Sequence, residues 1–298
     1  MDIPEPGFRI EPCERMLFVG SCFADSIGAR FREEGFPVTV NPYGTMYNPA
    51  SILHTIQRLF LPLNRGSQRR SDPPHDSLAQ TTPNPSYSGG EEVTYKTVFL
   101  TLGTNHVYRL KETGEIVDNC EKRPAALFQE EELSVDACAD YLTQAISLLR
   151  QVNPDIRIVL TVSPIRYRKY GYHGSQLSKA TLLLAVQKVI IKLNAQSSKF
   201  KASYFPAYEI VNDELRDYRF YASDMLHPSQ QAVDYIWERL VDAYFSPEAK
   251  AFLEEWRPLK QALGHKPFDP DSEAYKALMD KTMLKLEELR EKYPTFAI

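Results

Sequence analysis

Short apolar segments alternate with stretches of helical periodicity along this chain, and that alternation limits its fold more than any other feature. The apolar segments lie at 16–20, 37–40, 96–103 and 156–164, with the strand-like "ASYFPA" at 202–207. Each is short and bounded by turn residues, which is typical of fully buried strands. Strands that alternate with helices form a parallel sheet with helices on both faces. The sequence therefore predicts an α/β domain.

The segments between these strands predict the helices and the domain boundary. Helical spacing is present between Gly20 and Gly35 and at 50–60, 134–151, 175–196, 229–245 and 247–263, and a hairpin is expected at 106–119 around the "ETGE" turn. Residues 63–92 predict a long polar loop, and the last helix has Leu278, Thr282, Leu286 and Leu289 on one side. We expect one α/β domain at 1–245 and a helical extension at 246–298 that caps the sheet, forms a dimer or docks a partner.

The charge pattern argues against nucleic acid or an anionic membrane as the main partner. The net charge is −4, and the only basic clusters are Arg65–Arg70 and Arg166–Lys169. No apolar run reaches the roughly 20 residues of a membrane span. The start "MDIPEPGFRI" lacks the features of a secretory signal, and the four cysteines lack zinc-binding spacing. These features predict a cytoplasmic protein with reduced thiols, the alternative being a secreted protein whose leader was trimmed.

A candidate catalytic pair lies late in the chain, in "YASDMLHPSQQ". Pro228 favours a helix start, and the residue before a proline is excluded from helical geometry, so His227 is predicted in the preceding loop. Asp224 lies three residues earlier, close enough for its carboxylate to fix the imidazole tautomer. Taken alone, such a pair is more often part of an ordinary surface loop.

Other polar residues fall at the predicted strand ends, where ligands of parallel sheets bind. Gly20-Ser21-Cys22 follows the first strand, and Gly103-Thr104-Asn105 follows a later one. Backbone N–H groups and the Asn105 amide are suited to binding a developing oxyanion, and Gly44 is a further candidate donor. A thiol at Cys22 is a candidate nucleophile, but free cysteine is also a common space-filling core residue.

Several stretches carry a family resemblance. "VGSCFADSIG", "NPYGTMYNP", "LTLGTNHVYR" and "RFYASDMLHPSQQAVDYIWE" resemble blocks of the GSCFA-domain proteins, a bacterial family related to the SGNH (GDSL-type) esterases. The resemblance covers roughly residues 8–245. It implies a three-layer α/β/α, flavodoxin-like fold.

The resemblance also implies roles for individual residues. It aligns the esterase serine with Cys22, the second-block glycine with Gly44, the third-block Gly-x-Asn with Gly103 and Asn105, and the last block with Asp224 and His227. This chain departs from the superfamily at the first block, where Ser21 replaces aspartate and Cys22 replaces serine. Chemistry permits either as the nucleophile, and we favour Cys22 over Ser21.

The first functional hypothesis is an SGNH-like hydrolase or acyltransferase that acts on an ester or thioester, with acyl groups on a glycan as one candidate. Cys22 or Ser21 attacks the carbonyl, His227 moves the proton, and Asp224 orients His227. Asn105 and the N–H groups of Gly44 and residue 22 hold the oxyanion, and no metal or organic cofactor is needed. His106 is expected to line the cleft, or else to be an ordinary strand-end histidine.

The alternative is a non-catalytic protein of the same fold that binds a saccharide or a partner protein. Residues 63–92 and the C-terminal helices would then supply the binding surface, and a homodimer through those helices is a further expectation. The basic loop with Arg166, Arg168 and Lys169 either meets an anionic substrate group or is simply solvated. The sequence lacks a Gly-x-Ser-x-Gly elbow, a GxxxxGK phosphate loop and an HExxH helix, so three common enzyme classes lack their usual motif.

Overall fold

The computed structural model describes residues 1–60, 94–196 and 201–298. Its central sheet has five strands, all parallel, in the order β2-β1-β3-β7-β8. The strands are β1 (Met16–Gly20), β2 (Val38–Val40), β3 (Thr97–Leu102), β7 (Arg157–Val162) and β8 (Lys201–Tyr204). Within this sheet the chain order is 2-1-3-4-5, the flavodoxin-like order, whose ligand crevice lies between β1 and β3.

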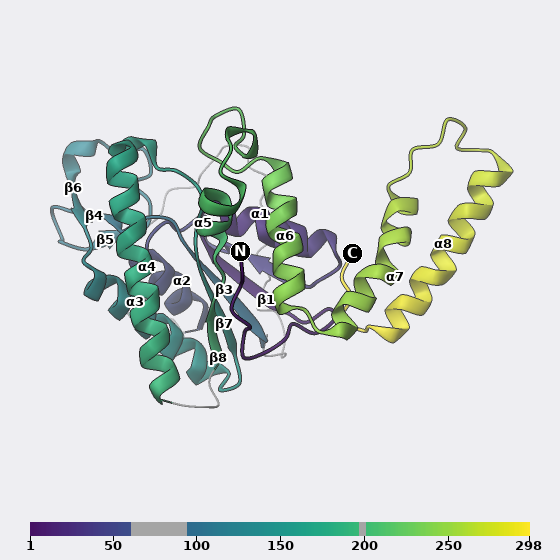
Figure 1. Cartoon of the computed structure of the whole chain (residues 1–298), viewed down its shortest axis with the longest axis horizontal. Helices are drawn as coiled ribbons and strands as arrows, with labels where there is room; N and C mark the ends of the chain where they lie inside the picture. The colour runs from purple at the N-terminus through teal and green to yellow at the C-terminus, as the bar shows by residue number, and fades with distance from the viewer. Residues whose placement is uncertain (61–93, 197–200) are drawn as a thin grey trace.

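Helices cover both faces of the sheet, as Figure 1 shows. On one side lie α1 (Cys22–Glu33) and α6 (Gln230–Tyr244). On the other lie α2 (Pro49–Phe60), α3 (Val135–Val152) and α4 (Gly171–Gln196). The predicted three-layer α/β/α flavodoxin-like fold with a helical C-terminal region is therefore confirmed.

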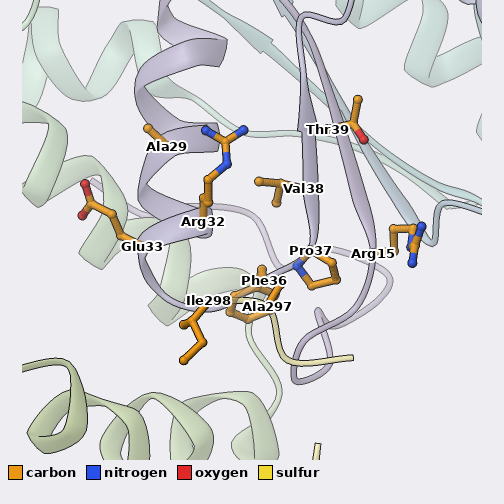
Figure 2. A pocket seen from close by; sticks show the side chains of 10 residues that line it. All are labelled: Arg15, Ala29, Arg32, Glu33, Phe36, Pro37, Val38, Thr39, Ala297 and Ile298. Atoms are coloured by element: carbon orange, nitrogen blue, oxygen red, sulfur yellow. The ribbon is translucent and has the colours of Figure 1, made fainter. Parts of the chain in front are cut away.

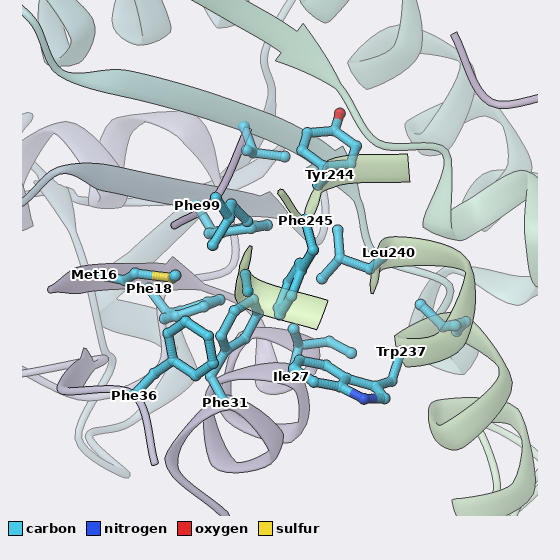
Figure 3. Packing of buried hydrophobic residues seen from close by; sticks show 14 of the residues in the cluster. Met16, Phe18, Ile27, Phe31, Phe36, Phe99, Trp237, Leu240, Tyr244 and Phe245 are labelled. Carbon is cyan, nitrogen blue, oxygen red and sulfur yellow. The ribbon is translucent and has the colours of Figure 1, made fainter. Parts of the chain in front are cut away.

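An aromatic cluster holds α1 and α6 against the sheet (Figure 3). The rings of Phe18 on β1 and Phe99 on β3 stack with centroids 4.6 Å apart. Phe31 on α1 meets Trp237 on α6 edge to face at 4.8 Å. Such pairs add about 0.5–1.5 kcal/mol each to the free energy gained from burying the rings. This packing fixes α1, and with it the residues at its N-terminus.

A second, antiparallel sheet has the order β5-β4-β6. The predicted hairpin is confirmed as β4 (His106–Leu110) paired with β5 (Ile116–Val117), but β6 (Phe128–Glu132) was not predicted. Its sequence "FQEEE" has one buried residue, Phe128, so it lacks the apolar alternation that predicts a strand. Strand pairing with β4 stabilises it instead.

Other boundaries differ from the predictions. The strand expected at 202–207 ends at Tyr204, because Pro206 has no N–H for the sheet ladder. The remaining short elements are η1 (Ala125–Leu127), η2 (Arg168–Tyr170), α5 (Ala207–Glu209), the π-helical η3 (Ile210–Leu215) and η4 (Tyr218–Phe220). The loop predicted at 63–92 lies outside the described residues, and no described helix is long and apolar enough to cross a membrane.

The C-terminal extension forms a helical hairpin, α7 (Pro247–Leu263) and α8 (Glu273–Lys292), which projects from one side of the domain (Figure 1). Its base shares the aromatic cluster of the main domain through Phe252, Trp256 and Phe296. Of the four residues predicted on one side of α8, Thr282, Leu286 and Leu289 are buried, whereas Leu278 is 41% exposed because it lies toward the projecting end. The boundary at 245/246 and the homodimer stay predictions.

Trp256 anchors this extension to the end of α1, since its Nε1–H donates to the Glu33 carbonyl at 3.1 Å. We expect Trp256→Phe to lower the free energy of unfolding by about 1–2 kcal/mol, because the partly buried Glu33 carbonyl loses its donor. Denaturant unfolding of the full chain measures this. Phe268→Ala is the control, because the side chain of Phe268 is fully exposed. An equal loss in both variants would contradict the anchoring role.

Candidate functional site

The bend between β1 and α1 buries Ser21 and presents Cys22. Gly20 has φ +148°, and a Cβ there would lie 2.1 Å from the Thr101 carbonyl oxygen, so only glycine fits. Ser21 is the fully buried N-cap of α1, and its hydroxyl accepts from the Phe23 N–H at 3.4 Å. Cys22 is the first residue of α1 and is half-buried. This geometry favours Cys22 over Ser21 as the nucleophile.

The loop after β2 is held beside this bend by its side chains. Asn41 accepts from the Gly20 N–H at 2.8 Å and donates to Asp25 at 2.7 Å. The Tyr47 hydroxyl lies 3.6 Å from the Cys22 sulfur. Burial raises the pKa of Tyr47 to about 12, with a further contribution from its contact with Cys22, so the phenol keeps its proton at neutral pH. It is therefore able to donate a hydrogen bond to a thiolate at Cys22.

The two glycines predicted near the oxyanion have backbone partners. The Gly44 N–H donates to the Asn41 carbonyl at 2.9 Å, within a turn. The Gly103 N–H donates to the Tyr47 carbonyl at 2.9 Å. In this conformation both N–H groups are therefore engaged by backbone carbonyls, and the oxyanion role of Gly44 stays a prediction. Cys22, as the first helical residue, has no intrahelical acceptor for its N–H, so this donor is the better candidate.

Asn105 and His106 are both buried, between the carboxyl end of β3 and the start of β4. The Asn105 side chain donates through Nδ2 to the Leu133 carbonyl at 2.8 Å, which leaves its second amide hydrogen for another acceptor. The His106 ring stacks on Tyr170 with centroids 3.6 Å apart. Burial lowers the pKa of His106, and the nearby Glu132 and Glu130 oppose this. His106 thus packs under Tyr170 and does not reach the Cys22 bend through any hydrogen bond recorded for it.

Asp224 and His227 form the pair that the sequence predicts. The Asp224 carboxylate lies 2.5 Å from His227 Nδ1 and also accepts from the backbone N–H groups of Leu226, at 2.9 Å, and His227, at 3.0 Å. These backbone bonds, followed by the ring contact, lower the pKa of Asp224 to about 2. The carboxylate therefore stays ionised at neutral pH and fixes the ring with Nε2 as its free nitrogen. His227 precedes α6 as predicted, although the N-cap is Ser229.

The packing of α1 on α6 brings Cys22 and His227 to the same edge of the sheet. Both helices follow parallel strands, so they run in the same direction. Phe31, nine residues after Cys22, packs against Trp237, ten residues after His227. The N-termini of α1 and α6 therefore lie at the same height along the sheet. The bend before α1 and the loop before α6 consequently lie at the same edge of the sheet. In this conformation the hydrogen-bond partner of the Cys22 sulfur is the Tyr47 hydroxyl, not His227.

Two residues near this edge were not predicted. Lys179 of α4 is fully buried and donates to the Gly103 carbonyl at 2.6 Å, and burial lowers its pKa to about 7. The Tyr167 hydroxyl is buried at the same glycine, where a Cβ would lie 2.4 Å from it. The burial of Lys179 could have been predicted from the sequence, because its spacing places it on the apolar side of α4 with Leu182 and Val186.

Elsewhere, a cavity of about 730 Å³ lies at the far end of α1 (Figure 2). It is lined by Arg32, Glu33, Phe36 and the chain end at Ile298, and its described lining residues include no cysteine, serine or histidine. It therefore offers neither the thiol nor the imidazole of the predicted chemistry. Among residues 1–60, 94–196 and 201–298, no three His, Cys, Asp or Glu side chains are grouped to hold a metal ion.

Two protein-family models match this chain. The model described as "GSCFA family" matches residues 15–240, and that described as "GSCFA domain protein, C-terminal domain" matches residues 256–298. No curated protein matches.

Solved structures are similar at low identity. A member of the lipolytic protein G-D-S-L family from Veillonella parvula is 11% identical, with a TM-score of 0.43, over 78% of this chain and 98% of that chain. A family 3 carbohydrate esterase from Clostridium thermocellum is 14% identical, with a TM-score of 0.39, over 77% of this chain and 96% of that chain. Similarity at this level carries no argument about the site.

Proposed function

This chain belongs to the GSCFA family, and we propose that it hydrolyses or transfers acyl groups from esters or thioesters through Cys22, His227 and Asp224. The substrate class is a small-molecule or glycan acyl ester. The cytoplasmic location and the homodimer remain predictions from the sequence.

The proposed reaction has two steps. The Cys22 thiol gives its proton to Nε2 of His227, and the sulfur forms a bond to the acyl carbon. The bond from that carbon to the leaving oxygen or sulfur breaks, and His227 returns the proton to the leaving group. Water, in a hydrolase, or an acceptor hydroxyl, in a transferase, then attacks the thioester on Cys22 and releases the thiol. Asp224 stabilises the charged His227 throughout.

The observation that carries this proposal is the Asp224 carboxylate at 2.5 Å from His227 Nδ1, in a loop at the same sheet edge as Cys22. An oriented histidine with one ring nitrogen free is the feature that a thiol nucleophile needs. In the described part of the chain, Asp224 is the only hydrogen-bond partner recorded for the ring. The N–H of Cys22 and the second Asn105 hydrogen supply the proposed oxyanion contacts.

A second candidate, a non-catalytic binding protein of the same fold, is favoured by the hydrogen bonds of Gly44 and Gly103. Both N–H groups are engaged within the backbone. A disarmed site would retain the fold and bind a saccharide or a partner protein without covalent chemistry.

Acyl transfer to the thiol tests the proposal directly. We expect short-chain p-nitrophenyl esters or acyl-thioesters to leave one acyl group on the peptide that contains Cys22, detected by mass spectrometry after acid quenching. Cys120→Ser is the matched control, because Cys120 is the other half-buried thiol, and Cys13 and Cys138 are buried with pKa values raised to about 12 by burial.

The acyl group should persist in Cys120→Ser and disappear in Cys22→Ala. Labelling that is confined to Cys120, or release of product without any adduct on Cys22 in a single turnover, would reject the thiol mechanism.

A further inference from the structure

A small polar cavity of about 170 Å³ lies beside the loop that carries Asp224 and His227. It is lined by Arg166, Asn212, Arg216, Asp217, Tyr218 and Tyr221. Pockets for whole ligands are usually 300–1,000 Å³. This cavity therefore fits a single chemical group of a larger molecule.

The charges of the cavity favour an anion. Neither Arg166 nor Arg216 forms an ion pair with any described acid. Asp217, the one acid among the described lining residues, accepts hydrogen bonds from the Arg219 backbone N–H at 2.9 Å and from its guanidinium at 3.2 Å. Two guanidinium groups without an acidic partner thus face one cavity. Guanidinium groups match the oxygens of phosphates and carboxylates.

Tyr221 adds an unsatisfied donor. Its side chain is only 8% exposed, and its buried hydroxyl, which interacts with the Arg166 guanidinium, has no acceptor for its own proton in the described part of the chain. The Arg166 guanidinium lies over the ring, 3.8 Å from its centroid, which fixes both groups. A buried O–H group without an acceptor is rare in native proteins, so the proton of this hydroxyl points to a missing ligand oxygen.

The cavity is tied directly to the proposed catalytic loop. The Arg166 N–H donates to the Leu226 carbonyl at 3.1 Å, and Tyr221 forms a β-bridge with Pro228. The Ala222 N–H donates to the His227 carbonyl at 2.8 Å. A group in the cavity therefore lies next to the residues that flank His227, at the upper end of α6 in Figure 1.

We infer that this cavity is an anion subsite, in which Arg166, Arg216 and the Tyr221 hydroxyl bind a phosphate or carboxylate group of the substrate. The inference rests on the proposed function for its account of the substrate, which is an acyl ester or thioester that carries an anionic group. Anion binding itself requires no catalysis.

Calorimetric titration of the full chain with inorganic phosphate, and separately with acetate, tests this at constant ionic strength. We expect saturable binding of at least one anion. Affinity should fall at least tenfold in Arg166→Gln and in Arg216→Gln, and several-fold in Tyr221→Phe. Arg168→Gln is the matched control, since Arg168 carries the same charge two residues from Arg166 but does not line the cavity. Arg166→Lys keeps the charge without the planar fork and should weaken binding less than Arg166→Gln.

No saturable binding of either anion, or equal binding in the Arg166→Gln and Arg216→Gln variants, would overturn the subsite. Thermal unfolding of each variant shows that a loss of binding is not a loss of folding. Anion binding by a chain that never acylates Cys22 would support the subsite and reject only the catalytic proposal. Acylation of Cys22 without anion binding would support the catalytic proposal and reject the subsite.

Discussion

Replacing Cys22 by alanine is expected to lower the turnover of an acyl ester or thioester by at least about 1,000-fold, because the proposed covalent intermediate forms on the Cys22 sulfur. Replacing His227 by alanine should lower it by about 100- to 10,000-fold, the usual contribution of a positioned base. The double variant should be little worse than the more damaged single variant, since the two groups act in one step. Steady-state kinetics of the three variants measures this.

Ser21→Ala provides the discriminating control. Ser21 is fully buried and caps α1, so its loss should cost about 0.5–2 kcal/mol of stability and leave most of the turnover. If Ser21→Ala removes turnover without a loss of stability while Cys22→Ala retains it, the assignment of the nucleophile to Cys22 is wrong.

Lys179 is expected to make the stability of the protein depend on pH above neutrality. Burial lowers its pKa from 10.5 to about 7, so between these values the unfolded chain binds a proton at Lys179 that the folded chain does not. Stability then rises with pH across this window. From pH 7 to pH 9 the contribution of Lys179 should amount to about 2 kcal/mol, and below pH 7 it should be constant.

Lys179→Met should remove this pH-dependent gain, whatever its effect on overall stability. Denaturant unfolding at several pH values between 7 and 9 compares it with the wild type. Lys192→Met, on the exposed face of the same helix, should retain the gain. Parallel pH profiles in the wild type and Lys179→Met would contradict the burial of an uncharged amine beneath Gly103.

Several parts of the structure follow from local sequence patterns. The buried strands β1, β3 and β7 were predicted to within two residues at each end, because continuous apolar runs bounded by turn residues have few alternatives. The Asp224–His227 contact was also predictable. The two residues are only three positions apart, and Pro228 keeps His227 in the loop before the helix.

Other features depend on tertiary contacts that no local pattern records. The strand β6 exists because β4 offers a partner, although "FQEEE" has little apolar character. The helix α4 begins at Gly171, earlier than predicted, because the glycines in "GYHGSQ" hide its start. The backbone bonds of Gly44 and Gly103 depend on how the loop after β2 folds over β3. The anion cavity unites Arg166 with residues 211–221, which are far apart in the chain.

The central claim is that the imidazole of His227 activates the Cys22 thiol. The rate of Cys22 alkylation by iodoacetamide, followed from pH 5 to pH 9 in a Cys120→Ser background, tests it most directly. We predict rapid alkylation near pH 7 that becomes at least tenfold slower in His227→Ala at the same pH, with the two proteins converging at high pH. Identical profiles with and without the imidazole would contradict the claim.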